Sequence, residues 1–273
     1  MKIKHKLKPK VINEIIELRD SRNSVNDFTE NFIKNLSSRY CLMHEYLKEH
    51  KDNKEHIKIL AGLYLSSLVS CWETFFRDVV DFIVETDEEA NKKALDFFSD
   101  KGIKIDDILA EGICLGDFVS KQFNFQRLDD TCNAFNFLFN DNKTCITEYV
   151  SESSFDKILF SSPNFLLYYI QQKKDISMML KETFTKVFDI RHKVIHDANF
   201  MIKIDVEFMS KVEDCFTIFP QLISVWVAKK YNQNLFVANI NDGTIRFTNQ
   251  LNDFENILIF TKDDFTAEYK VVE

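Results

Sequence analysis

The sequence is poor in the residues that form tight turns, with 5 Gly and 3 Pro in 273 residues. Average usage is roughly 7% Gly and 5% Pro, so a β-sandwich or barrel with a turn every ~8–12 residues is difficult to build. A mostly helical protein needs few such residues. Apolar residues make up 45% of the chain, and Phe alone contributes 27, which is enough for a hydrophobic core and excludes global disorder. We therefore expect a mainly α protein.

Cysteine pairs and long apolar runs are also missing. The six cysteines are scattered and include no CxxC pair, which favours buried free thiols in a reducing compartment. Lysine occupies every second position from Lys2 to Lys10, but residues 11–20 are then amphipathic, whereas a signal peptide would continue with an apolar run. No stretch approaches the ~20 apolar residues of a membrane span. These absences predict a soluble, cytoplasmic protein.

The charge balance is acidic, because 35 Lys and Arg stand against 43 Asp and Glu and give a net charge of −8. This argues against a protein whose whole surface binds nucleic acid, although it leaves room for a local basic groove. The lysines before residue 11 are open to two interpretations, a solvated terminus or an arm that contacts RNA.

Apolar residues recur at helical spacing from Val11 to about Tyr231. The spacing predicts several short helices between residues 87 and 160 and four long helices, over residues 23–50, 54–85, 176–196 and 205–231. Asn53 is expected to cap the second long helix, Pro163 to lie near the start of another short helix, and Pro220 to kink or split the last one. The helix over 54–85 is apolar over more than half of its circumference, so we place it at the centre of a bundle.

After Tyr231 the pattern changes from helical to alternating. Alternation begins at Leu235, a turn signal follows at Asn241-Asp242-Gly243, and residues 245–247 and 257–260 are further strand candidates. We read this region as a small β-meander. The expected organisation is a helical domain with an N-terminal helical extension over residues 1–231 and a small β appendage over 232–273.

One segment concentrates chemically useful side chains, Phe188-Asp-Ile-Arg-His-Lys-Val-Ile-His-Asp197. Its two histidines, His192 and His196, are four residues apart and share a helical face. Arg191 and His196 are separated by about 140° around an ideal helix, so they converge only if the Arg side chain wraps around or the helix loosens. Such a cluster offers a fixed cation for a phosphate and an imidazole that exchanges protons near neutral pH.

The spacing alone leaves two other interpretations open. A His pair beside Lys193 and Asp197 is typical of a solvated helix C-terminus, where the helix dipole favours cations. A metal site on His192 and His196 would need a third ligand, such as Asp197 or Glu73, and the sequence has no HExxH-type base.

The arrangement Arg-polar-x3-His at the end of an apolar helix, upstream of a final helix, resembles the Arg-x4-6-His motif of HEPN-domain proteins. A second element agrees, because residues 57–84, with Glu73 directly after an aromatic residue, resemble the central helix of that family. The similarity covers about residues 54–231 and is closest to the RiboL-PSP-HEPN group.

The resemblance implies a HEPN-like helical bundle and, as in many members, a metal-independent ribonuclease. The family's Arg falls on Arg191 and its His on His196. The polar residue after the Arg is commonly Asn in the family and is His192 here, which leaves three roles open: orienting the scissile phosphate, transferring a second proton, or none. Members commonly dimerise so that two motifs face one cleft, which implies a homodimer with a composite active site.

Glu73 shares a helical face with Val69 and Phe76, so we expect it to be half-buried and to require a partner. Two partners are open. One is Arg77, in an i,i+4 ion pair, and the other is Arg191, which Glu73 would hold in place from across the bundle.

We therefore expect an endoribonuclease that acts without metal or cofactor, with Arg191, His196 and His192 as catalytic residues and Glu73 as their support. RNA would be cleaved by attack of its 2′-OH, and the family context suggests bacterial anti-phage defence or a toxin–antitoxin system, with an antitoxin or regulatory protein as a further partner. The alternatives are a non-catalytic HEPN-like module that binds a protein or RNA, and a metal-dependent hydrolase built on the two histidines.

Other candidates are assigned structural roles. His44, His50 and His56 do not share a helical face and are expected at the surface. The Phe-rich stretch Phe118–Phe139 could stack on bases, but Phe at helical spacing is more typical of a core.

Overall fold

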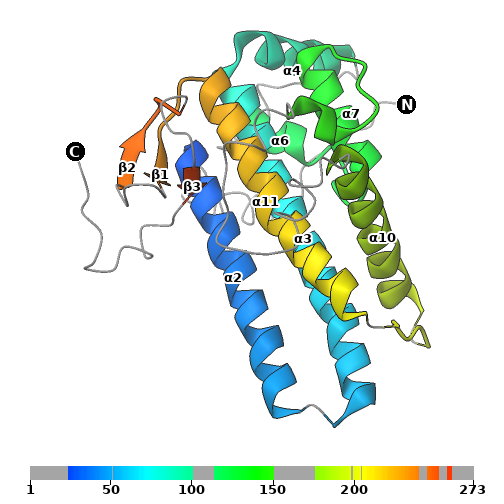
Figure 1. Ribbon diagram of the computed structural model, residues 1–273. Coiled ribbons are helices and arrows are strands. Elements are labelled where there is room, and N and C mark those ends of the chain that lie inside the picture. The colour runs from blue at the N-terminus through cyan, green and yellow to red at the C-terminus, as the bar shows by residue number, and fades with distance from the viewer. Residues whose placement is uncertain are drawn as a thin grey trace.

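The computed structural model describes residues 24–50, 52–100, 114–150, 176–197, 199–203, 205–239, 245–251 and 257–259. In these residues the chain forms a helical bundle with a small antiparallel sheet near the C-terminus (Figure 1), as the sequence predicts. The predicted N-terminal extension, the short helix near Pro163 and the turn at 241–243 lie outside the described residues. The elements are α2 (Val25–Glu49), α3 (Lys54–Thr86), α4 (Glu88–Asp100), α6 (Leu115–Ser120), α7 (Leu128–Phe139), the 3-10 helix η1 (Ile146–Tyr149), α10 (Ile176–His196), α11 (Val206–Lys230), β1 (Leu235–Asn239), β2 (Ile245–Thr248) and β3 (Ile257–Ile259).

The long helices begin where polar side chains satisfy their first backbone N–H groups. Ser24 Oγ accepts from the Asp27 N–H at 3.2 Å, and Asn53 Oδ1 accepts from the His56 N–H at 3.2 Å. Asp205 starts α11 in the same way. Pro220 does not split α11, which is continuous from Val206 to Lys230.

The helix α3 is central, as its apolar circumference predicts. It packs against α2, α4, α6, α7, α10 and α11. Trp72, which is fully buried, lies on the ring of Phe219 in α11 at a centroid distance of 5.8 Å and meets Phe184 and Phe188 of α10 at 4.6 and 5.6 Å. Its Nε1 donates to Thr131 Oγ1 in α7 at 3.3 Å. One side chain thereby ties four helices together.

Among the described helices, α3 is the one that is long and apolar enough to cross a membrane by length and composition. The sequence predicts no membrane-spanning segment because α3 contains no uninterrupted apolar run of about 20 residues. Of its most apolar 18-residue window, 56% is buried inside the bundle. The core helix of a bundle meets the same criteria, so this composition is weak evidence for a membrane span.

Several predictions about individual side chains are confirmed. Phe118, Phe125 and Phe135 lie in the core, so most of the Phe-rich stretch serves packing. The side chains of His44, His50 and His56 are exposed. The six cysteines are free, but the prediction that they are buried is wrong for Cys41, which is exposed, and Cys114 is only partly buried.

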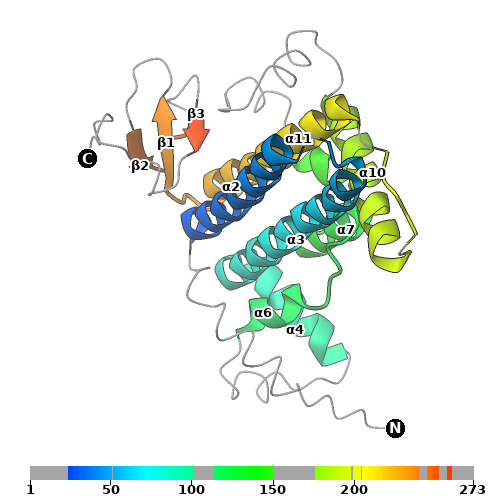
Figure 2. The ribbon, with the colours of Figure 1, turned by 90° about the horizontal axis from the view of Figure 1, so that it is seen from below.

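The sheet has the strand order β2-β1-β3, with β1 antiparallel to both neighbours. Figure 2 shows it beside α2, at the edge of the bundle. Leu235 and Val237 of β1 are fully buried, and the Phe236 N–H donates to Asn26 Oδ1 of α2 at 3.1 Å. Alternation along β1 therefore directs one face of the strand towards the helices.

Helix α6 approaches α3 so closely that only glycine fits at the contact. A Cβ on Gly116 would lie 2.6 Å from the Asp81 carbonyl oxygen and would also overlap the Asp81 side chain. The Gly116 N–H donates to Glu85 Oε1 at 2.8 Å, which fixes the start of α6 against α3.

We expect Gly116→Ala to lower the free energy of unfolding by about 1–3 kcal/mol, because the added methyl meets backbone that cannot move away. Urea denaturation measures the change. Gly62→Ala is the matched comparison: its Cβ would lie 3.0 Å from a movable Val194 methyl, and alanine gains about 1 kcal/mol of helix propensity. Equal stability of Gly116→Ala and wild type would contradict the close approach.

Candidate active site

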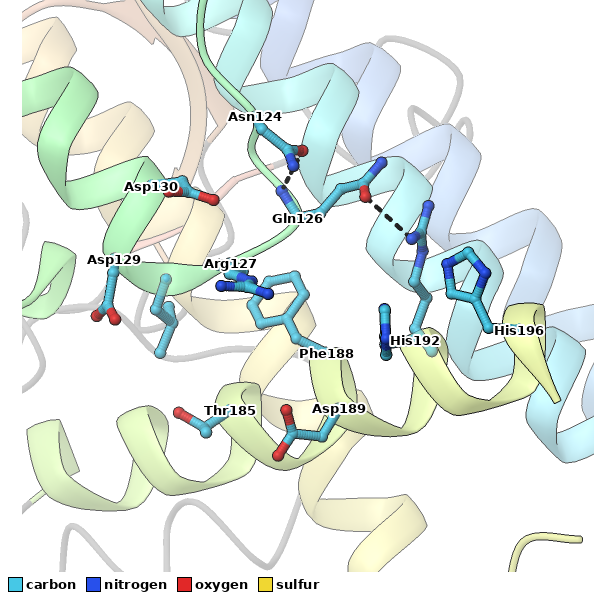
Figure 3. A pocket seen from close by; sticks show the side chains of 12 residues that line it. Asn124, Gln126, Arg127, Asp129, Asp130, Thr185, Phe188, Asp189, His192 and His196 are labelled. Atoms are coloured by element: carbon cyan, nitrogen blue, oxygen red, sulfur yellow. Dashed lines mark hydrogen bonds between the residues drawn. The ribbon is translucent and has the colours of Figure 1, made fainter. Parts of the chain in front are cut away.

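A cleft of about 690 Å³ lies between α10 and the segment that leads into α7 (Figure 3). One wall is a stripe of α10, and the other is the loop before α7 together with its first turn. Four of the α10 residues follow one another at spacings of three or four and share one helical face; they are Thr185, Asp189, His192 and His196. The residues that line the cleft are Asn124, Gln126, Arg127, Leu128, Asp129, Asp130, Thr185, Phe188, Asp189, Arg191, His192 and His196.

All three predicted catalytic residues line this cleft. The helix does not loosen before His196, because α10 extends to that residue and the Asp197 N–H still donates to the Lys193 carbonyl at 2.9 Å. Arg191 and His196 therefore reach one cleft from a regular helix, and the length of the Arg side chain bridges the angle between them.

The position of Arg191 follows from how α10 crosses α3. Gly62 of α3 lies against Val194, whereas Trp72, further along α3, contacts the earlier residue Phe184, so the two helices run antiparallel. Side chains on a helix lean towards its N-terminus. Glu73 on α3 and Arg191 on α10 therefore lean towards each other.

Arg191 is held from two sides. Its Nη2 lies 3.7 Å from Glu73 Oε1, and its Nη1 donates to Gln126 Oε1 at 3.0 Å. The Arg191 side chain is 17% exposed and the Glu73 side chain 12%, so water screens this ion pair less than it screens a surface pair. The guanidinium is fixed while part of it still faces the cleft.

Both predicted partners of Glu73 are present. Its second oxygen, Oε2, lies 3.6 Å from Arg77 Nη2, one turn further along α3. A single carboxylate therefore serves two guanidinium groups, and the two interpretations that the sequence left open are both correct.

The histidines lie at the outer end of the cleft. The rings of His192 and His196 are 4.6 Å apart between centroids and inclined by 53°, and both residues are exposed. Figure 3 shows them next to each other on the last turns of α10. Both imidazoles are therefore accessible from solvent.

Sequence reasoning missed the opposite wall, formed by Asn124, Gln126 and Arg127. The signal for it was an alternation, because Phe123 and Phe125 turn towards the core and the polar residues between and after them face the cleft. Asn124 Oδ1 accepts from the Gln126 N–H at 3.2 Å, which shapes the loop locally.

Within the described part of the chain, no three His, Cys, Asp or Glu side chains converge as a metal-binding set would. Glu73, one candidate for the third ligand beside His192 and His196, faces two arginines instead. The other candidate, Asp197, accepts from the Asn199 N–H at 2.9 Å.

The two ends of the cleft differ in charge. Arg191 and the two histidines lie at one end and Asp129 and Asp130 at the other, with Asp189 of α10 between them (Figure 3). The first end can bind an anion and transfer protons.

No protein-family model matches the chain, and no match was found among curated proteins or solved structures.

The shared carboxylate predicts unequal coupling energies. In double-mutant cycles with Glu73→Gln, we expect about 1–2 kcal/mol of coupling to Arg191→Gln, because that pair is mostly buried. Coupling to Arg77→Gln should be about 0.2–0.5 kcal/mol, as for an i,i+4 pair. Urea denaturation of the single and double variants measures both values. Larger coupling to Arg77 than to Arg191 would show that Glu73 does not mainly anchor Arg191.

Proposed function

We propose that this protein is a metal-independent endoribonuclease of the HEPN type. The proposal rests on one observation above all: Arg191, His192 and His196 line a single cleft, and Glu73 and Gln126 anchor the Arg191 guanidinium there. The resemblance of these residues to the HEPN motif supplies the reaction class.

In the proposed reaction, His196 removes the proton from an RNA 2′-OH, and the 2′-oxygen attacks the adjacent phosphorus. Arg191 offsets the negative charge that builds on the phosphate oxygens of the pentavalent transition state. His192 donates a proton to the leaving 5′-oxygen as the P–O5′ bond breaks. The products are a 2′,3′-cyclic phosphate and a 5′-OH, and the reaction consumes no water, cofactor or metal.

The fixed guanidinium supports the assignment of Arg191 as the charge-stabilising group. Arginine carries five N–H donors, and the contacts to Glu73 and Gln126 engage only its two terminal nitrogens in part. The remaining donors can face a phosphate. A cation that is already oriented does not have to reorganise as the transition state forms.

The proposed setting is the bacterial cytoplasm, in anti-phage defence or as the toxin of a toxin–antitoxin pair. This setting comes from the family resemblance alone. An antitoxin or regulatory protein would then control access to the cleft, which is open to solvent at its histidine end.

Purified protein incubated with total RNA in EDTA should leave 2′,3′-cyclic phosphate ends, detected by end mapping. We expect His196→Ala and Arg191→Ala to lower the rate by about 10²-fold or more, the scale of a lost general base or electrostatic stabiliser. His192→Asn introduces the residue common in the family. It should lower the rate, because Asn cannot protonate the leaving 5′-oxygen; retained activity would contradict the role of His192 as the proton donor.

His50→Ala is the matched control, since His50 is exposed and does not line the cleft. Cleavage that persists in the Arg191 and His196 variants would contradict the site. RNA or protein binding without cleavage would favour the non-catalytic module, and cleavage only with added Mg²⁺, Mn²⁺ or Zn²⁺ would favour the metal-dependent hydrolase.

We further propose that the active form is a homodimer with the two motifs facing one cleft. Exposed apolar side chains next to the motif support this proposal. Ile59 and Leu63 lie one turn apart on α3 and are 49% and 57% exposed, and Ile195 on α10 is 51% exposed. The two helices touch here, at the contact of Gly62 with Val194. A second copy could cover these side chains and bring its own Arg and His residues close.

Light scattering at micromolar concentration should give the mass of a dimer, and Leu63→Glu should shift it towards the monomer and reduce cleavage, because a charge then faces the interface. Leu95→Glu on α4, where the side chain is 37% exposed, serves as the control and should remain dimeric. A monomeric wild type that cleaves RNA would contradict the shared cleft.

A further inference from the structure

We infer that Arg127 forms a second phosphate-binding position in the cleft, which takes the phosphate of a nucleotide next to the scissile one. The inference rests on the proposed function, since it assumes that the ligand of the cleft is an RNA strand. It assigns a role to the wall of the cleft opposite α10.

Arg127 and the catalytic residues face the same space from opposite walls. Arg127 is exposed, is the residue before the first turn of α7, and lines the cleft together with Phe188 and His192. Figure 3 shows its side chain between the loop and α10, at the level of Phe188. Phe188 precedes His192 by four residues, about 6 Å along the helix axis. Arg127, at the level of Phe188, is therefore separated along the cleft from His192.

The two arginines of the cleft differ in how far their charge is compensated. Arg191 is paired with Glu73. Arg127 makes no side-chain ion pair or hydrogen bond with any residue of the described ranges. An arginine that lines a cleft without a carboxylate partner is the group best able to bind an incoming anion, and its planar donors match phosphate oxygens.

The backbone of Arg127 is firmly held. Its carbonyl accepts from the Thr131 N–H at 3.1 Å and from Thr131 Oγ1 at 3.0 Å. Thr131 in turn accepts from Trp72, and the neighbouring Leu128 is buried. The point at which the Arg127 side chain is attached is thus fixed relative to the core and to α10.

The carboxylates at the far end set the extent of the anion-binding surface. Figure 3 shows Asp129 and Asp130 on the side of Arg127 away from the histidines, and they would repel a third phosphate placed there. The strand is therefore held by two phosphates and must leave the cleft next to them. A flexible single strand or loop can turn in this way, so the inferred substrate class is single-stranded RNA with at least two consecutive phosphates.

Binding of short 2′-O-methyl RNA tests the inference, since these strands lack the attacking hydroxyl. With fluorescently labelled strands, a trinucleotide with two phosphates should bind wild type about tenfold more tightly than a dinucleotide with one. In Arg127→Gln the two strands should bind equally, and Arg127→Lys should restore part of the difference. The slope of log Kd against log salt for the trinucleotide should fall by about 0.7 in Arg127→Gln, the value for one single-strand phosphate.

Lys92→Gln removes an exposed cation of α4 outside the cleft and should change neither quantity. Equal strand preference and equal salt slope in wild type and Arg127→Gln would overturn the inference, as would a wild type that binds neither strand. Cleavage of long RNA is measured in parallel, where Arg127→Gln should raise KM about tenfold with little change in kcat. If wild type does not cleave RNA but still binds the trinucleotide more tightly than the dinucleotide, and Arg127→Gln abolishes this difference, the proposed nuclease activity is refuted and the second phosphate position is retained.

Discussion

The packing of α10 against α3 around Trp72 is the interaction on which the rest of the molecule depends. Trp72 contacts two Phe residues of α10, and its direct neighbour Glu73 meets Arg191 of the same helix. The register that buries the aromatic rings is therefore the register that pairs the charges. A slip of α10 by one residue would rotate its apolar face by about 100° away from Trp72. The helices also touch at Gly62 and Val194, so apolar packing at two points along α3 fixes the position of α10 and of the cleft residues that it carries.

The shared carboxylate gives Glu73 two counter-charges, where a simple ion pair would give it one. A mostly buried carboxylate that loses its only cation is strongly destabilised. Glu73 also faces Arg77, so it has a second counter-charge beside Arg191. The neutral Gln126 contact orients Arg191 without adding a second negative charge. The guanidinium is consequently held in one orientation by two different partners.

The features that could be predicted from the sequence are those set by residues close together in the chain. Helical periodicity and caps such as Asn53 are local, and they gave the bounds of α3 and α10 to within one residue. The Arg191 motif lies within one helix and was found by its spacing and its resemblance. Gln126 is 65 residues away from Arg191, in a loop without periodicity, and Arg127 precedes α7 without any motif. Their positions depend on how α7 packs on Trp72, which no local pattern specifies.

The charge distribution explains how an acidic protein can present an anion-binding site. The net charge of −8 repels RNA at long range, so the overall field does not recruit a substrate. Within the cleft, however, Arg191 and the histidines lie apart from Asp129 and Asp130 (Figure 3), and over such short distances the nearest groups dominate. Recognition would then depend on contacts made inside the cleft. Two phosphates supply only a modest electrostatic attraction, so contacts added by a second protomer would raise the affinity of the proposed site.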